Sequence, residues 1–374
     1  MALRRRGHEK VKRPSVIDVG RLAGVDHSTV SRVLNNSPNV SELTRSKVMA
    51  AVQMTGYKPF SSARSLVLRR HETIGLVFER EHVNTSYGVR LIEGITERLS
   101  EMGWRLAMGM VRWYSPADEI ENLPLLRTQA VDGLILDVTL IRGNLDAVVG
   151  RLGLPYVYVN PSGGRAYNTI MPDDIGAVRM ATQYLLDRGH RKIGYIPCCK
   201  RTHHSSQGER MKGYAQTLSQ AGLAPIPTWD QPMDDIYRPE GGYYQRIKLY
   251  RERYGCTAVV TYSSLESVRV LFTCHQLGLK VPDDLAIVGC DFDPMATFAP
   301  VPMPTVRLDR IQMGQLAVEM LKKRIEHPEE DQPSVTIKGT MIENPWSWYG
   351  PDGLNVGEED LYQEETITDD NEPA

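Results

Sequence analysis

The stretch that most constrains this chain lies near its N-terminus, between Pro14 and Asn36. Apolar residues recur there at helical spacing in two groups separated by a glycine, which predicts two short helices around a tight turn. Ser15 with Asp18 three residues later predicts the start of the first helix, and Gly24 predicts its end. Two short helices joined in this way are typical of the helix-turn-helix, whose second helix enters the major groove of DNA.

The second of these helices carries a polar outer face. Its apolar spacing turns Val30 and Val33 inward, and the polar residues left for contact with DNA are His27, Ser28, Thr29, Ser31, Arg32 and Asn35. We expect the first two to reach base edges and the arginine to bind a guanine through paired hydrogen bonds. The other three are expected to position the helix on phosphates. The alternative is an ordinary helical hairpin with a solvated polar face.

The charge of the chain is divided unevenly along its length. Residues 1–70 hold 14 Lys and Arg against 4 Asp and Glu, whereas the remaining residues hold 30 against 42. A basic head on an acidic body predicts that one end binds a polyanion. We expect residues 1–13 to be a basic disordered tail and residues 350–374 to be an acidic disordered tail.

From Thr73 onward, short β-branched strands alternate with helical segments. This alternation predicts parallel sheets with helices on both faces, in two doubly wound α/β halves. One of the predicted helices spans residues 117–129. A third helix, over 41–56, completes the head, so the predicted fold is an all-α three-helix head joined to an α/β body.

The residues from 18 to 66 resemble the N-terminal head of the LacI family of transcription regulators. The matching positions are the turn (Ala23, Gly24, Val25), the second helix (29–35), the start of the third helix (Val40, Ser41, Thr44, Arg45), its exit (Gly56, Tyr57, Pro59) and the segment that follows (Ala63, Arg64, Leu66). The resemblance continues to about Pro345. It implies a two-lobed body of the periplasmic-binding-protein type, assembly into a homodimer or tetramer, and repression of transcription at a pseudo-palindromic operator in double-stranded DNA.

The same resemblance implies a domain plan. It gives a DNA-binding head over 14–58, a hinge helix over 59–71 and an effector-binding and dimerisation domain over 72–349. Lobe 1 would hold about 72–171 plus 305–333, and lobe 2 about 172–304 plus 334–349. In the family the hinge helix pairs with its copy and inserts a leucine into the minor groove. We therefore expect Leu66, with Ala63 beside it, to contact DNA. The alternative is a linker that packs on its own body.

A small-molecule effector is expected between the lobes, beyond the carboxyl ends of the strands. The resemblance implies that Arg210 and Asp291 contact the effector. The rule that ligands bind beyond the carboxyl ends of the strands, here called the strand-end rule, adds Tyr87, Asn160 and Tyr262. An arginine and a carboxylate suit a hydroxyl-rich or anionic ligand, such as a sugar. Tyr262-Ser263 replaces a pair that contains aspartate in the family. This departure keeps open the alternative that the body serves only for dimerisation.

Several functional classes are disfavoured by the sequence. It has no GxSxG and no GxxxxGK[ST] motif. We therefore expect that the protein is not an enzyme and that it has no catalytic residues and no cofactor. The Cys198-Cys199 and His203-His204 pairs lack the spacing of a metal site. No run of about 18 apolar residues is present, so we expect no membrane span and a cytoplasmic protein. The family includes regulators whose effector weakens DNA binding and others whose effector strengthens it, and the sequence favours neither.

Overall fold

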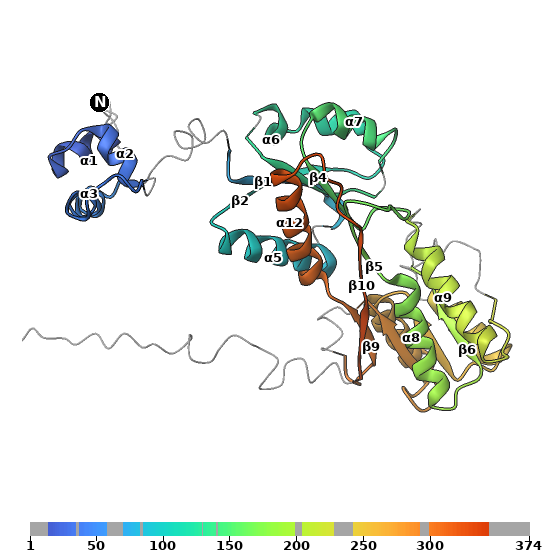
Figure 1. Ribbon diagram of the computed structural model, residues 1–374. Helices are drawn as coiled ribbons and strands as arrows, with labels where there is room; N and C mark the ends of the chain where they lie inside the picture. Colours follow the sequence, from blue (N-terminus) through green and yellow to red (C-terminus); the bar gives the residue numbers. More distant parts are fainter. Residues whose placement is uncertain are drawn as a thin grey trace, which may run out of the picture. The chain divides into compact units, whose positions relative to one another are not determined.

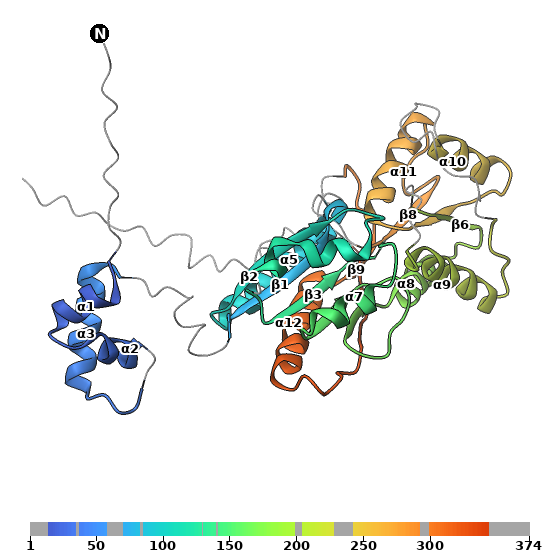
Figure 2. The ribbon, with the colours of Figure 1, turned by 90° about the horizontal axis from the view of Figure 1, so that it is seen from above.

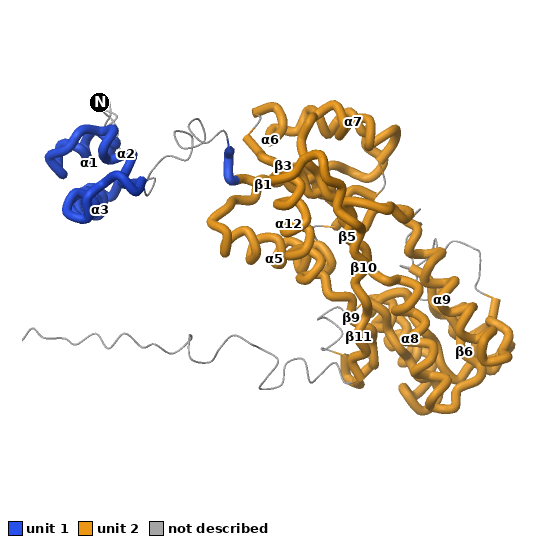
Figure 3. The backbone as a smooth tube through the Cα atoms, viewed as in Figure 1, with its two compact units in different colours: residues 1–72 blue, residues 73–374 orange. Residues whose placement is uncertain are grey.

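The computed structural model describes residues 14–34, 37–57, 70–82, 85–128, 130–139, 141–198, 204–227, 242–291 and 299–343. The chain divides into two compact units, residues 1–72 and residues 73–374 (Figure 3). The first unit is the predicted helical head, and the second contains two sheets with flanking helices. Each unit is described by itself below.

The described residues of the head form three short helices, which Figure 2 shows packed together. These are α1 (Val16–Ala23), α2 (His27–Leu34) and α3 (Glu42–Thr55). Their buried core is formed by five small apolar side chains: Val19, Val30, Val33, Val48 and Ala51. The apolar positions at helical spacing thus form the shared interior of the three helices, as the sequence pattern predicts.

Some of the predicted DNA contacts lie outside the described residues. Asn35 is one of them, and Ala63 and Leu66 fall in the segment 58–69. The predicted hinge helix therefore remains a prediction. The same is true of the predicted tails over 1–13 and 350–374.

The first sheet of the body has six strands in the order β10-β5-β4-β3-β1-β2 (Figure 1). The strands are β1 (Thr73–Glu79), β2 (Arg105–Val111), β3 (Gly133–Asp137), β4 (Tyr156–Val159), β5 (Thr169–Pro172) and β10 (Val335–Ile337), all paired in parallel. Ile74, Leu76 and Phe78 of β1 pack with α5 (Ser86–Glu101) and α12 (Arg310–Glu326) on one face. Val77 packs on the other face, towards α7 (Leu145–Leu152). Both faces of β1 are therefore covered, which explains the apolar run from Ile74 to Phe78.

The second sheet has five strands in the order β11-β9-β8-β7-β6. These are β6 (Ile193–Ile196), β7 (Ala258–Thr261), β8 (Ala286–Cys290), β9 (Thr305–Leu308) and β11 (Gly339–Ile342), with only β11 antiparallel among the described pairs. One face packs with α8 (Asp174–Asp187) and α9 (Ser206–Gln220), and the other with α10 (Gly242–Glu252) and α11 (Ser264–Gln276).

Two predicted lobe boundaries are wrong, because the chain crosses between the two sheets at other positions than expected. The strand at 305–308 was expected in the first lobe, but β9 pairs with β8 and β11 in the second sheet. The segment from 334 was expected in the second lobe, but β10 pairs with β5 in the first sheet before β11 returns to the second. These strands are only three or four residues long. Their own sequence pattern does not choose between the sheets, so the choice depends on chain connectivity and packing in three dimensions.

The helix predicted over 117–129 is also corrected. The structure has a 3₁₀ helix, η2 (Ala117–Asn122), and a separate single turn, α6 (Pro124–Arg127). Leu123 between them is extended, with φ −60° and ψ 136°. The residue before a proline is disfavoured in the helical region, so Pro124 starts a new helix instead of continuing the old one.

Candidate functional site

The helix-turn-helix is held by the local contacts that its sequence predicts. The Ser15 side chain accepts the Asp18 amide, and the Asp18 carboxylate accepts the Ser15 amide at 2.9 Å, which forms a complete capping box. Gly24 ends α1 with φ 67°, a left-handed conformation that suits glycine. The Asp26 carboxylate accepts the Ser28 amide at 2.8 Å at the start of α2. The turn is therefore fixed by contacts between neighbours in the chain.

The outer face of α2 is polar and open to solvent. His27, Ser28, Ser31 and Arg32 are exposed, and Thr29 is partly exposed. Val30 and Val33 on the opposite face are buried in the head core. The side chains predicted to read DNA therefore lie together on one accessible surface, apart from the residue at 35, which is not described.

Arg45 of α3 supports the far end of α2. Its guanidinium donates to the carbonyl oxygen of Val33 at 3.3 Å and to that of Ser37 at 3.0 Å. The last carbonyls of a helix lack partners within the helix, and a cation there also interacts favourably with the helix dipole. Arg45 therefore fixes the orientation of the helix that carries the polar face. Its role could not be read from helical spacing, because both partners lie in other segments.

Replacing Arg45 with alanine is expected to loosen α2. Hydrogen bonds from charged donors are each worth about 1.5–3 kcal/mol, and the partly buried pair made by Arg45 would be lost. Hydrogen exchange of the α2 amides in the full-length protein measures this effect, and we expect at least about tenfold faster exchange. Exposed Lys47 on the same helix provides the control, because Lys47→Ala removes a charge without removing these bonds. Equal exchange in the two variants would contradict the assigned role.

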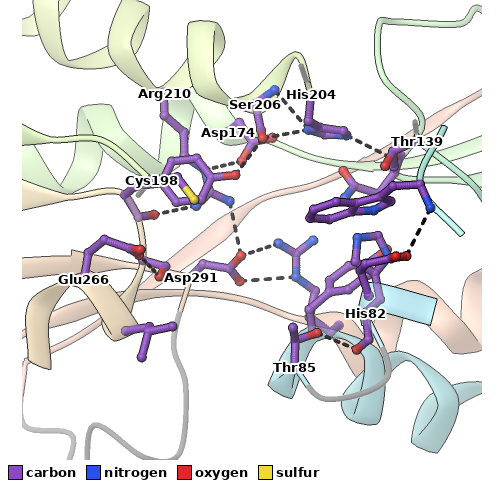
Figure 4. Close-up of a pocket in the computed structure, with 18 of the residues that line it drawn as sticks. His82, Thr85, Thr139, Asp174, Cys198, His204, Ser206, Arg210, Glu266 and Asp291 are labelled. Carbon is purple, nitrogen blue, oxygen red and sulfur yellow. Dashed lines mark hydrogen bonds and ion pairs between the residues drawn. The ribbon is translucent and has the colours of Figure 1, made fainter. Parts of the chain in front are cut away.

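The two sheets of the body meet at a cavity of about 220 Å³ (Figure 4). The lining side chains come from both lobes and include all five that the sequence analysis proposes for the effector: Tyr87, Asn160, Arg210, Tyr262 and Asp291. The carboxyl ends of parallel strands converge there, as expected for ligand sites in open α/β sheets. The cavity also contains residues that the sequence did not point to: Trp113, Glu266, Arg269 and Arg310.

The lobe 2 wall of the cavity is built on Arg210. This residue of α9 is 2% exposed and donates from Nε to Asp174 at 2.6 Å and from Nη2 to Asp291 at 3.2 Å. Its Nη1 donates to the backbone carbonyl of Tyr262, and its guanidinium lies 4.2 Å from the centroid of the Tyr262 ring. The arginine is thus fixed by a carboxylate on each side.

Arg310 extends this set of ion pairs across to lobe 1. It is the first residue of α12 and donates to Asp291 from Nη2 at 2.7 Å and from Nε at 3.3 Å. Burial alone would raise the pKa of Asp291, but the guanidiniums of Arg310 and Arg210 outweigh it and hold that pKa below the ordinary value. Asp174, Arg210, Asp291 and Arg310 form an alternating series of charges, here called the charge chain. Figure 4 labels the first three of these residues.

The lobe 1 wall is organised around Asp137 at the end of β3. Its carboxylate accepts the Tyr87 hydroxyl at 2.8 Å and lies 3.0 Å from Nδ1 of His82. Burial alone would lower the pKa of His82, but the charge and hydrogen bond of Asp137, together with the charges of Glu79 and Glu81, outweigh burial and raise that pKa. Nearby, buried Glu79 accepts the Trp113 indole N–H at 2.8 Å and the Thr139 amide at 2.7 Å. These bonds orient the aromatic side chains beside the cavity.

His204 joins the two lobes. Its Nδ1 accepts the backbone N–H of Ser206 at 3.1 Å, so the neutral ring carries its proton on Nε2 and donates to the Asn160 carbonyl at 3.1 Å. Burial lowers the pKa of His204, which agrees with a neutral ring. The sequence pairs Cys198-Cys199 and His203-His204 lack the spacing of a metal site. Cys198 and His204 line the cavity, and the other two lie outside the described residues.

Comparison with known proteins agrees with this arrangement. Residues 15–59 match the bacterial regulatory proteins of the lacI family. Residues 71–238 match the periplasmic binding proteins and sugar-binding domain of the LacI family, and residues 182–343 match the periplasmic-binding-protein-like domain. The ribose operon repressor of Haemophilus influenzae is 31% identical over 327 residues, which cover 87% of this chain and 96% of the relative.

The chain belongs to the LacI family. Among solved structures, the complex of the transcriptional regulator CelR with cellobiose is 27% identical, with a TM-score of 0.61 and coverage of 89% of this chain and 99% of that chain. The lac repressor dimer bound to operator and the anti-inducer ONPF has a TM-score of 0.73 over 90% of this chain and 99% of that chain. At 22% identity it shows that the LacI fold is shared. Across the described part of the chain, no helix combines the length and apolar character needed to span a bilayer.

Proposed function

We propose that this LacI-family protein is a transcriptional repressor that binds a pseudo-palindromic DNA operator as a dimer. One observation carries the proposal. A single chain contains both a capped helix-turn-helix with an exposed polar face and a two-lobed domain with a polar cavity. The described relatives support it, since the relative with 31% identity is a ribose operon repressor and the lac repressor structure is an operator-bound dimer. A two-fold dimer fits a two-fold site.

In this proposal the exposed residues of α2 read the operator. His27 and Ser28 contact base edges, Arg32 binds a guanine, and Thr29, Ser31 and Asn35 contact phosphates. The segment 59–71 acts as a hinge helix, in which Leu66, flanked by Ala63, inserts into the minor groove. Such a regulator works in the compartment that holds the DNA, which is the bacterial cytoplasm, and it needs neither a catalytic residue nor a cofactor.

A small polar effector, such as a sugar, is proposed to bind in the cavity and to change the closure of the two lobes. Arg210, Asp291, Tyr87, Asn160 and Tyr262 are the proposed contacts, and Arg310 joins them on structural grounds. The charge chain favours a sensing role over a body that only dimerises. Four charged side chains in a mostly buried position carry a large desolvation cost that a purely structural interface avoids.

The proposal is tested with purified full-length protein and fragments of the source genome at about 150 mM salt, where electrostatic non-specific binding is moderate. Sedimentation equilibrium should give a dimer, and the retained fragments should share a sequence with two-fold symmetry. We expect their affinity to exceed that of random fragments by at least about 10³-fold, which is typical of specific regulators. A monomer with equal affinity for all fragments would overturn the proposal.

A further inference from the structure

The charge chain presents its members unequally to the cavity. The side chains of Arg210, Asp174 and Arg310 are 2%, 3% and 6% exposed, whereas that of Asp291 is 21% exposed. A molecule that enters the cavity therefore meets a carboxylate first, and the guanidiniums lie behind it. A carboxylate accepts hydrogen bonds and repels anions.

The two guanidiniums of the chain are already engaged by carboxylates. Arg210 donates to one on each side, at 2.6 Å and 3.2 Å, and Arg310 binds Asp291 through two nitrogens. An anionic group could reach either arginine only by displacing an aspartate that stays beside it. This would leave like charges in contact in a poorly solvated site, which is strongly unfavourable.

The rest of the cavity wall is also negatively charged, as Asp291 is. Its other ionisable lining residues include Glu81, Glu266 and Arg269, and the last two lie 3.3 Å apart as an ion pair. Across the described lining, four carboxylates face three guanidiniums. Asp137 and Glu79 add two fully buried carboxylates behind the lobe 1 wall, close to His82. A concave site lined in this way carries a negative potential.

We propose that the cavity selects an uncharged compound rich in hydroxyl groups and rejects the phosphate ester or carboxylic acid of the same compound. Hydroxyl groups donate to the Asp291 carboxylate without disturbing its bonds to the arginines. The inference deepens the proposed function, on which it rests, by naming the class of effector. A regulator with this preference senses a metabolite before a kinase phosphorylates it. The preference excludes the anionic ligands that an arginine alone would suit.

Inorganic phosphate is a direct probe of this preference. Calorimetric titration of the full-length protein, at constant ionic strength, measures phosphate binding to wild type and to Asp291→Asn. The variant keeps the shape of the side chain but removes the charge that shields both arginines. We expect Asp291→Asn to bind phosphate at least about tenfold more tightly than wild type, because a unit charge a few ångströms from the anion has been removed. Adding Arg310→Gln to this variant should abolish the gain.

The matched control is Asp118→Asn, which removes one carboxylate from an exposed pair with Arg151 on the surface of lobe 1. It should bind phosphate as wild type does, including any binding at the basic head. If Asp291→Asn does not fold, Asp174→Asn tests the same prediction, because it releases Nε of Arg210.

Two results would overturn the inference. The first is that the wild-type protein binds phosphate and that Arg310→Gln weakens this binding. Such a result would mean that the arginines are open to anions. The second is that a folded Asp291→Asn or Asp174→Asn variant binds phosphate no more tightly than wild type. Neither measurement involves DNA, so the inference can fail while operator binding stands, and operator binding can fail while the preference for uncharged compounds stands.

Discussion

Arg210→Ala is expected to destabilise the sensor domain by about 3–5 kcal/mol, the cost of removing one partner from a buried ion pair. The substitution leaves Asp174, which is 3% exposed, without the guanidinium that lies 2.6 Å from it, and it removes one of the two arginines at Asp291. Chemical denaturation followed by circular dichroism measures the free energy of unfolding. Any effector-induced rise in melting temperature should also be lost in this variant.

Two further variants separate loss of the ion pair from general damage. Arg188→Ala breaks an exposed pair with Glu343, in which the side chains are 45% and 67% exposed. It should change the free energy of unfolding by less than about 1 kcal/mol. Combining Arg210→Ala with Asp174→Asn should recover part of the lost stability, because the uncompensated buried charge is removed. Wild-type stability in the single Arg210→Ala variant would contradict the role assigned to the charge chain.

Arg32→Ala is expected to weaken operator binding by about 1–3 kcal/mol, roughly 5- to 150-fold, and to relax the preference at one base pair in each half-site. Arg32 is exposed on α2 and takes no part in the head core, so the melting temperature of the variant should match wild type. Fluorescence anisotropy with operators altered at single positions measures both the affinity and the preference.

A second arginine of the head provides the comparison. Arg21 on α1 is 77% exposed, and its guanidinium lies 3.4 Å from Asp18. Arg21→Ala removes one positive charge, so any loss of affinity should be similar for all sequences and should decrease at high salt. If Arg32→Ala behaves in the same way, Arg32 contacts the DNA backbone and the proposed readout of a guanine is wrong.

The predictions that the sequence supported best depend on contacts between neighbours in the chain. The capping box of Ser15 and Asp18 and the left-handed Gly24 involve residues a few positions apart. The apolar run from Ile74 to Phe78 in β1 likewise predicts a strand covered on both faces. Such features can be read from the sequence because the hydrogen bonds and the side-chain period that produce them repeat over two to four residues.

The cavity was only partly predictable. The strand-end rule and the family resemblance brought Tyr87, Arg210 and Asp291 to one cavity. Arg310 was missed, because its residue type and spacing suggest only a charged first turn of a helix. Its partner Asp291 lies 19 positions earlier in the chain and in the other lobe. Nothing in the local pattern indicates that the chain between them returns α12 to the edge of the cavity.

The sequence by itself determined the helix-turn-helix, the alternation of strands and helices, and the LacI family, because each depends on local periodicity or on an ordered set of matching residues. Only the tertiary structure decided that β9 lies in the second sheet and β10 in the first. Only the structure placed Arg310 on Asp291 and exposed the carboxylate in preference to the guanidiniums. The physical reason is that short strands and single charges have many acceptable partners, and burial and chain connectivity in three dimensions select among them.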